Sequence, residues 1–249
     1  MLFIGERVGT KKGQALDIAV DPLEGTNFVA NNLPNAFSVV AVSEKNNLFF
    51  APDTYMEKIA IGANLPKNLL DLDNSIEKNI SLLANAKQTT PDKLTVCILE
   101  RPRHEQTINS LKKMNVNLKL ISDGDVSGVI YTVDNNSPVD MYVGIGGGPE
   151  GILAASALDA NKCFFQGRLL FDNENNIKRA KEMGIKDLKK KYNINELVTG
   201  DSIFTATGIT DGDLLNGIKI DGKIYISETL VTHKRSGTFE IIKIENEIL

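Results

Sequence analysis

The sequence predicts a mixed α/β fold, and three observations lead to this prediction. Stretches with apolar residues at helical spacing alternate with strand-like stretches nearly to the C-terminus. No Pro/Ser-rich linker, low-complexity tract or internal repeat divides the chain. The 249 residues, 42% of them hydrophobic, are enough to bury a core in one large domain or two small ones.

The N-terminal part of the chain is predicted to be mainly sheet. Residues 15–20 form an apolar strand that ends at Asp21. Residues 36–43 and 48–51 have the pattern of two further strands, and the polar run 44–47 lies between them. We expect these two strands to pair antiparallel across that turn.

The middle of the chain is predicted to combine helices with strands. Apolar residues recur at helical spacing within 75–87. A βαβ-like unit follows, with a strand at 94–99, a helix at 105–114 and a strand at 116–121. We expect a boundary between two lobes near residues 85–95.

The last part of the chain begins with a strand at 141–145 that leads into an apolar helix opened by glycines and Pro149. A polar helical stretch covers 174–191, and the C-terminal third is rich in strands. Asp221-Gly222, flanked by alternating apolar residues, predicts a tight hairpin. Residues 237–249 are expected to form the last strand.

Charge and hydropathy exclude several classes of function. The 28 basic and 32 acidic residues leave a formal charge of −4, so no general cationic field favours nucleic acid or an anionic membrane. No apolar run reaches the roughly 20 residues of a membrane-spanning helix, and the first residues are too few for a secretory signal. The sequence therefore predicts a cytoplasmic protein without nucleic-acid or membrane partners.

The cysteines and histidines point to no metal site of their own. Cys97 and Cys163 lie in apolar runs and are expected to be buried hydrophobic residues. His104 and His233 are the only histidines, which excludes a histidine-rich metal site. His104 begins a predicted helix, where we expect a surface or capping residue rather than a general base.

The segment DIAVDPLEGTN carries the clearest chemical pattern. Asp21 and Glu24 are crowded onto one turn, and hard divalent ions such as Mg²⁺ or Mn²⁺ prefer such oxygen ligands. Pro22 fixes the turn, Gly25 permits close approach of a phosphate, and Thr26 can position an attacking water. The same residue types also occur in ordinary strand-ending turns, so this alternative stays open.

The segment DPLEGT resembles the metal-binding signature of the lithium-sensitive phosphatase superfamily and, in its Glu form, class II fructose-1,6-bisphosphatases. Six further segments resemble that family in the same order: IGERVG, APDTYMEK, ERPRH, SDGDV, GIGGGPEG and FTATGITDGDLL. The resemblance implies a layered α/β sandwich of mixed sheets and helices. It also implies a metal-binding lobe at residues 1–90, incomplete at its N-terminus, and a second α/β lobe with substrate-binding loops at residues 91–249.

The resemblance also implies the reaction and the residues that perform it. A water activated by Mn²⁺ or Mg²⁺ would hydrolyse the 1-phosphate of fructose 1,6-bisphosphate, a step of gluconeogenesis, without a covalent intermediate. The implied metal ligands are Asp21, Glu24 and Glu150, and Thr26 would align the water, so that the implied catalytic residues are Thr26, Asp21 and Glu24. The implied substrate contacts are Glu24, Gly25, Thr26, Tyr55, Arg101, Pro102, Arg103, Asp123, Gly124, Asp125 and Gly147.

Residue chemistry supports several of these contacts separately. Arg101 and Arg103 follow an apolar strand and offer forked donors to a phosphate, although basic residues at a strand end are often solvated. The carboxylates of Asp123 and Asp125 can accept hydrogen bonds from sugar hydroxyls, although such a segment is also a common loop. Tyr55 offers a flat face to a sugar or to the protein core.

The glycine-rich segment permits a rival interpretation. Gly146, Gly148 and Gly151 match a dinucleotide-binding fingerprint, and an acidic residue, Asp172, follows roughly 20 residues later. Against this, the neighbouring Pro149 removes a backbone donor and Glu150 places a negative charge where the pyrophosphate would lie. We therefore favour the phosphatase over a dinucleotide-binding protein.

The sequence departs from the family pattern at its start. Family members carry a portion before the segment that begins here at Ile4, including an acidic GEGE stretch that helps to bind metals. A wrongly assigned start or split gene, complementation by another chain, and decay would each explain this, and we favour the first. The alternatives to the main function are a silent phosphosugar-binding protein and a phosphatase for sedoheptulose 1,7-bisphosphate or an inositol phosphate. A homo-oligomer is left open.

Overall fold

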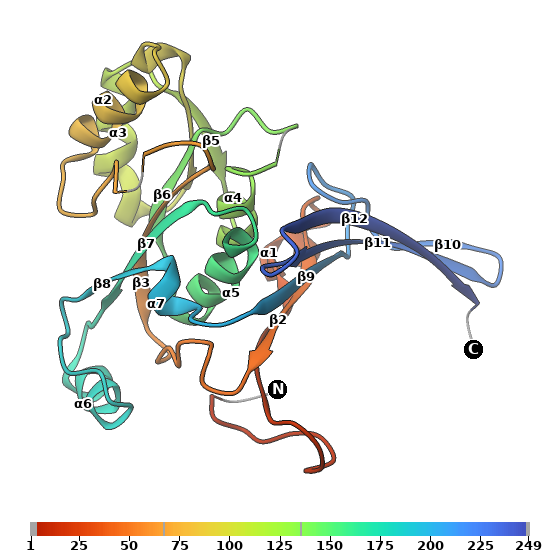
Figure 1. Cartoon of the computed structure of the whole chain (residues 1–249). Helices are drawn as coiled ribbons and strands as arrows, with labels where there is room; N and C mark the ends of the chain where they lie inside the picture. The colour runs from red at the N-terminus through yellow and green to blue at the C-terminus, as the bar shows by residue number, and fades with distance from the viewer. Residues whose placement is uncertain (1–3, 67, 135, 248–249) are drawn as a thin grey trace.

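The computed structural model describes residues 4–66, 68–134 and 136–247. These residues form two sheets, with helices packed between them and outside one of them (Figure 1). The helices are α1 (Thr26–Ala30), α2 (Ile76–Ala86), α3 (Glu105–Lys113), α4 (Asp125–Ile130), α5 (Gly148–Asp159), α6 (Glu174–Glu182) and α7 (Ile194–Leu197), with the 3₁₀ turns η1 (Pro91–Lys93) and η2 (Pro102–His104).

The first sheet is antiparallel and joins the two ends of the chain. Its order is β1-β2-β9-β11-β10, and β12 pairs with the other edge of β11. Its strands are β1 (Leu16–Glu24), β2 (Phe37–Glu44), β9 (Ser202–Gly208), β10 (Lys219–Asp221), β11 (Ile224–His233) and β12 (Thr238–Glu247). The strands β10, β11 and β12 extend away from the rest of the molecule (Figure 1).

The second sheet is mixed and is built from the middle of the chain. Its order is β5-β4-β6-β3-β7-β8, in which β5, β4 and β6 run parallel and the other pairs are antiparallel. Its strands are β3 (Tyr55–Ile61), β4 (Thr95–Leu99), β5 (Asn117–Ile121), β6 (Met141–Gly147), β7 (Phe164–Leu170) and β8 (Lys191–Asn193). The parallel part is the expected consequence of the βαβ unit.

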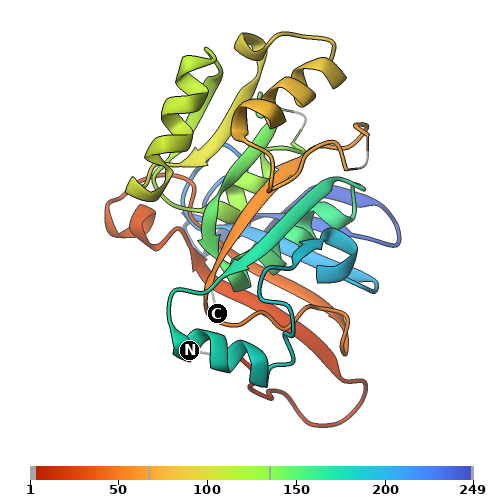
Figure 2. The same ribbon diagram turned by 90° about the vertical axis from the view of Figure 1, so that its left-hand side faces the viewer.

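The layers form an α/β sandwich, as the sequence predicted. Helices α2 and α3 lie together on one face of the second sheet (Figure 2), and α4 and α5 lie on its other face. Helix α5 also contacts β1, β2 and β9, so it lies between the two sheets. Its sequence is apolar on all sides, which is the pattern of a buried helix, and nearly all of it is buried.

Several predicted elements are confirmed. The helix predicted at 75–87 is α2, which begins after Ser75, whose side chain accepts the N–H of Lys78 at 3.2 Å. The βαβ unit is β4, α3 and β5, and the strand leading into an apolar helix is β6 and α5. The predicted hairpin is β10 and β11, with Gly222 at φ 60 as the first of its two turn residues. The last strand is β12, and residues 248–249 of that prediction lie outside the described residues.

Other predictions were wrong in their details. Residues 36–43 do not pair with 48–51, because both edges of β2 are taken by β1 and β9. Instead, Leu48 forms an isolated bridge with Val198. The helix predicted at 174–191 is shorter, because α6 ends before Gly184, whose φ of 91 stops it.

The lobe boundary near residues 85–95 stays a prediction. The first sheet uses residues 16–44 and 202–247, whereas the second uses residues 55–193. No helix within residues 4–66, 68–134 and 136–247 has the length and hydropathy needed to cross a membrane.

Candidate active site

Two carboxylates of the candidate site lie where β1 bulges. Asp21 pairs with Val39 of β2 and Glu24 pairs with Phe37, so β1 has one extra residue between these pairs. Because β1 is an edge strand, it tolerates Pro22, which lacks an N–H group for a second neighbour, and the strand continues past the predicted end at Asp21. Glu24 is buried at the end of this bulge, with 3% of its surface exposed.

The third carboxylate, Glu150, belongs to the first turn of α5. Its Oε2 accepts the N–H of Gly147 at 2.7 Å, which holds the side chain over the start of the helix. Ligand atoms of Asp21, Glu24 and Glu150 all lie within 4.8 Å of one another. The fold thus joins the end of a strand in the first sheet to the helix that follows a strand of the second.

The electrostatics of this carboxylate group fit a divalent cation. Burial, followed by the charges of Asp125 and Glu150, raises the pKa of Glu24 well above its ordinary value. Burial, followed by the charge of Asp125, raises the pKa of Glu150 to about 7, against an opposing effect of Lys58. Carboxylates crowded in this way ionise together only when a positive charge lies among them, and their oxygens are the donors that hard divalent cations prefer.

The predicted substrate loops meet beside the carboxylates. Thr26 is exposed at the start of α1, directly after Gly25, whose φ of 82 turns the chain out of β1. Asp123 accepts the N–H of Asn27 through Oδ2 at 3.1 Å, and its Oδ1 lies 3.6 Å from Nη2 of Arg101. The SDGDV segment therefore contacts both the DIAVDPLEGTN segment and the ERPRH segment.

Tyr55 and Arg103 form the other side of the same region. Tyr55 pairs with Gly147 in the second sheet, and half of its surface is exposed. The guanidinium of Arg103 lies 5.1 Å from the centre of the Tyr55 ring. Nε and Nη2 of Arg103 donate to the carbonyl of Ile145 at 3.0 and 2.7 Å. Two of the guanidinium donors that were expected to bind a phosphate therefore bind the backbone of β6. Pro102 begins η2 and is exposed between the two arginines.

The comparison with known families decides the identity of this arrangement. The family model described as "Bacterial fructose-1,6-bisphosphatase, glpX-encoded" matches residues 1–246. The chain belongs to this family.

Curated relatives agree with the family model. The chain is 41% identical over 257 residues to fructose-1,6-bisphosphatase 1 class 2 of Escherichia coli (strain K12), covering 98% of this chain and 76% of the relative. The class 2 enzyme of Haemophilus influenzae is 37% identical over 257 residues, with 98% and 77% covered. The D-fructose 1,6-bisphosphatase class 2/sedoheptulose 1,7-bisphosphatase of Prochlorococcus marinus (strain MIT 9515) is 39% identical over 245 residues, with 93% and 73% covered.

In this class 2 family member, packing accounts for the glycines that resemble a dinucleotide fingerprint. A Cβ at Gly146 would overlap Oδ2 of Asp125, and a Cβ at Gly151 would lie 2.5 Å from the sulfur of Met56. A Cβ at Gly148 would lie 3.0 Å from a backbone carbonyl oxygen. The glycines therefore let α4 approach β6 and let β3 approach α5 closely, and Glu150 occupies the position where a pyrophosphate would need donors.

Two features of the site extend beyond the predicted roles. Asp125, predicted as a sugar contact, is only 4% exposed and forms an ion pair with Lys58, which the sequence analysis did not single out. Lys58 interrupts an apolar strand, YMEKIAI, and a charged residue in such a strand is the signal that could have found it.

His104 is not the surface residue that the sequence predicted. It is 3% exposed, its Nδ1 donates to the carbonyl of Leu99 at 2.8 Å, and its Nε2 accepts the N–H of Ile145 at 2.8 Å. Burial lowers its pKa, which favours the neutral form that this pair of hydrogen bonds requires. It makes no side-chain capping bond to α3 and instead fastens the ERPRH loop to β6.

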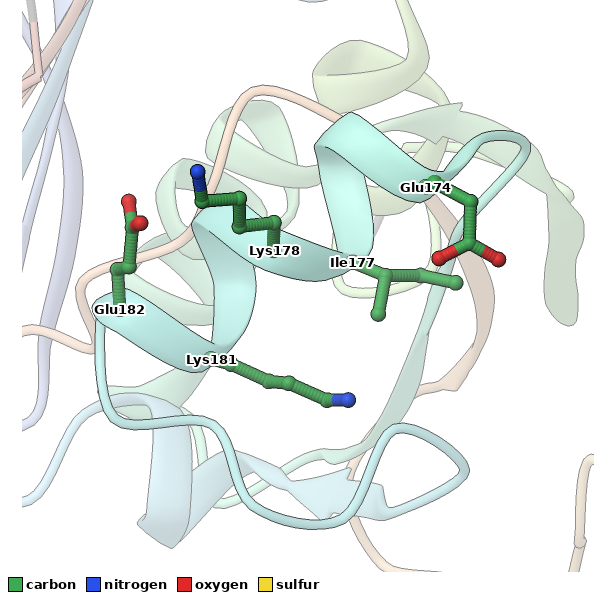
Figure 3. Close-up of a pocket in the computed structure, with 5 residues that line it drawn as sticks. All are labelled: Glu174, Ile177, Lys178, Lys181 and Glu182. Atoms are coloured by element: carbon green, nitrogen blue, oxygen red, sulfur yellow. The ribbon is translucent and has the colours of Figure 1, made fainter.

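A surface hollow of about 400 Å³ lies on a different element, α6. Figure 3 shows that its five lining residues all come from this helix and that their side chains spread along it rather than converging. They are Glu174, Ile177, Lys178, Lys181 and Glu182. The hollow contains none of the predicted site residues.

Proposed function

We propose that this chain hydrolyses the 1-phosphate of fructose 1,6-bisphosphate, giving fructose 6-phosphate and phosphate, in a reaction that needs a divalent cation. The observation that supports this most strongly is the meeting of Asp21, Glu24 and Glu150 within 4.8 Å, although they come from separate parts of the chain. Membership of the fructose-1,6-bisphosphatase family supports fructose 1,6-bisphosphate as the substrate.

In this proposal Asp21, Glu24 and Glu150 hold Mn²⁺ or Mg²⁺. Their carboxylate oxygens are suitable ligands. Burial and the neighbouring negative charges raise the pKa values of Glu24 and Glu150, and a bound cation would oppose both effects. When bound, such a cation supplies activation of water and neutralisation of charge on the phosphoryl group. Asp21 and Glu24 thereby take part in catalysis as well as in binding.

Thr26 is proposed to align the attacking water. It is exposed at the start of α1, two residues after Glu24 in the chain. A hydroxyl both donates and accepts hydrogen bonds, so it can hold a water in a defined orientation toward the phosphorus. Water attacks directly, and no covalent intermediate forms.

The substrate contacts are divided between two groups of residues. Arg101 is one-third exposed and its contact with Asp123 is long, so its guanidinium can exchange this partner for a phosphate. Tyr55, backed by Arg103, offers a face and a hydroxyl to the sugar. The remaining proposed contacts with the substrate are Glu24, Gly25, Thr26, Pro102, Asp123, Gly124, Asp125 and Gly147.

Sedoheptulose 1,7-bisphosphate is a second candidate substrate. The names of the relatives from Prochlorococcus marinus and Trichodesmium erythraeum include both bisphosphatase activities. The two substrates share a bisphosphorylated sugar chain, so the same arginines can serve both.

Phosphate release by the purified chain tests the proposal. Fructose 1,6-bisphosphate, sedoheptulose 1,7-bisphosphate and an inositol monophosphate are compared with Mn²⁺, with Mg²⁺ and with EDTA. We expect cation-dependent release from the sugar bisphosphates that Glu150→Gln abolishes and the exposed control Glu174→Gln preserves. Binding without release under both metals would instead support a silent phosphosugar-binding protein.

We further propose that this reaction is a step of gluconeogenesis in the cytoplasm, and the fructose-1,6-bisphosphatase family of the chain supports this. Sedimentation of the active preparation shows whether the chain works alone or as a homo-oligomer.

A further inference from the structure

Lys58 is a fully buried lysine in the centre of the second sheet. It lies in β3 between Met56 and Ala60, on the face that packs toward α5, and none of its surface is exposed. A buried ammonium group is costly unless a negative charge compensates it. Its compensating partner is Oδ2 of Asp125, at the start of α4.

Asp125 has a second oxygen that this pair does not use. Oδ1 of Asp125 is buried and has no hydrogen-bond partner among the residues that the structure describes. The next residue, Val126, donates its N–H to Oε1 of Glu24 at 3.0 Å, so the start of α4 lies beside the carboxylate group. A buried carboxylate oxygen without a donor needs a ligand to compensate its lost hydration.

The position of the pair is fixed by close packing. A Cβ at Gly146 would overlap Oδ2 of Asp125 and lie 3.1 Å from Nζ of Lys58. A Cβ at Gly151 would lie 3.2 Å from Cε of Lys58. Gly146 near the end of β6 and Gly151 in the first turns of α5 therefore leave the space in which Lys58 and Asp125 meet.

We propose that Asp125 is a fourth carboxylate ligand of the metal centre and that Lys58 is its built-in counter-ion, competing with the divalent cation for negative charge. This inference rests on the proposed function, since it assigns two more residues to the same centre. The four carboxylates and one ammonium carry a formal charge of −3. Without the ammonium this charge becomes −4, and without Asp125 it becomes −2.

The two side chains therefore have opposite effects on cation affinity. Neutralising Asp125 removes a ligand and a negative charge, and weakens binding. Neutralising Lys58 frees Oδ2 of Asp125 and makes the group more negative, and strengthens binding. A lysine that only supported the fold would weaken binding when replaced.

Calorimetric titration of the purified chain with MnCl₂ alone tests this directly. We expect Asp125→Asn to weaken Mn²⁺ binding at least about tenfold. Lys58→Gln keeps a hydrogen-bond donor for Asp125 but removes the charge, and we expect it to bind Mn²⁺ roughly threefold more tightly or better. In EDTA, Lys58→Gln is expected to melt at a lower temperature than the wild type. Mn²⁺ is expected to raise the melting temperature of Lys58→Gln by more than it raises that of the wild type.

Lys234 provides the matched control. It forms a 2.7 Å ion pair with the buried Asp159 at the other end of α5. Lys234→Met therefore removes the charge of a comparable pair about 12 Å along the helix axis from Gly151, beside which Lys58 lies, and should leave Mn²⁺ affinity within twofold of the wild type.

The outcomes separate this inference from the proposed function. The inference is wrong if Asp125→Asn binds Mn²⁺ as the wild type does, or if Lys58→Gln binds no more tightly. If Glu150→Gln still weakens binding in that case, the proposed metal centre stands without the two added residues. If the wild type binds no Mn²⁺ at millimolar concentration, both the centre and the inference fall.

Discussion

The two ends of helix α5 show how the same kind of buried pair serves different purposes. At its C-terminal end, Lys234 and Asp159 form an ion pair whose lysine is about one-quarter exposed. Near its start, Lys58 and Asp125 are both almost fully buried, and the carboxylate group of Asp21, Glu24 and Glu150 lies nearby. Charge is nearly balanced at one end and strongly unbalanced at the other. Only the unbalanced end has an electrostatic reason to bind a cation.

Replacing Glu150 should produce the largest change, because it removes a ligand from the unbalanced end. Glu150→Gln keeps the size of the side chain and a contact to Gly147, and we expect phosphate release to fall at least about 100-fold. The measurement is metal-dependent phosphate release at saturating fructose 1,6-bisphosphate. Asp159→Asn makes the equivalent change at the balanced end and should leave the rate within about twofold of the wild type.

Filling the space around the Lys58–Asp125 pair should have the second-largest effect. A side chain at Gly146 overlaps the carboxylate of Asp125, so Gly146→Val must displace the pair or the backbone. We expect a loss of at least about 2 kcal/mol in the free energy of unfolding, measured in urea, together with weaker Mn²⁺ binding. Gly144→Ala, which meets only the ends of side chains at 3.2 Å or more, is the control. Equal effects of both variants would show that the pair is not specifically constrained.

The pH dependence of the free energy of unfolding should show at which end of α5 a bound metal ion displaces protons from carboxylates. The pKa of Glu150 is raised from 4.5 to about 7, so between these values the folded chain binds a proton that the unfolded chain has released. In EDTA, the contribution of Glu150 to the free energy of unfolding should therefore be fully present below pH 4.5 and fall as the pH rises toward about 7.

Saturating Mn²⁺ should remove that fall, because the cation stabilises the ionised carboxylates. Burial also raises the pKa of Asp159, but Mn²⁺ should not alter its contribution. Denaturation between pH 4.5 and 8, with and without Mn²⁺, measures both parts. A pH dependence that Mn²⁺ leaves unchanged, or that Glu150→Gln retains in full, would contradict this assignment.

The smallest effect is expected from a single substrate contact near the start of α5. Tyr55→Phe removes the exposed hydroxyl but keeps the ring that lies beside Arg103. We expect KM for fructose 1,6-bisphosphate to rise by roughly three- to tenfold, the value of about one hydrogen bond, with little change in kcat. Steady-state kinetics measure this, and the equivalent Tyr192→Phe on β8 is the control.

Sequence periodicity predicted the elements whose apolar pattern is regular. α2, the βαβ unit and α5 were predicted because local spacing alone determines which of their faces are buried. Strands β3 and β7 were not predicted, because Lys58 and Arg168 interrupt their apolar runs. Their partners, Asp125 for Lys58 and Glu57 for Arg168, lie 67 and 111 residues away in the sequence.

The same reason limited the prediction of the site. The crowding of Asp21 and Glu24 is visible within four residues, and the resemblance to a family added Glu150. His104 gained its role only from the packing of β6 beside it, which no local pattern records. For Lys58 the sequence showed a charge within an apolar strand, but not its partner Asp125 on α4. A histidine or lysine with its compensation far along the chain looks like a surface residue until the fold is known.

Anomalous diffraction from a crystal grown with MnCl₂ tests the central claim most directly. The account predicts a manganese peak bonded to carboxylate oxygens of Asp21, Glu24 and Glu150, with Oδ1 of Asp125 as a further ligand. Strong manganese peaks elsewhere, with these side chains hydrogen-bonded only to protein or water, would contradict it.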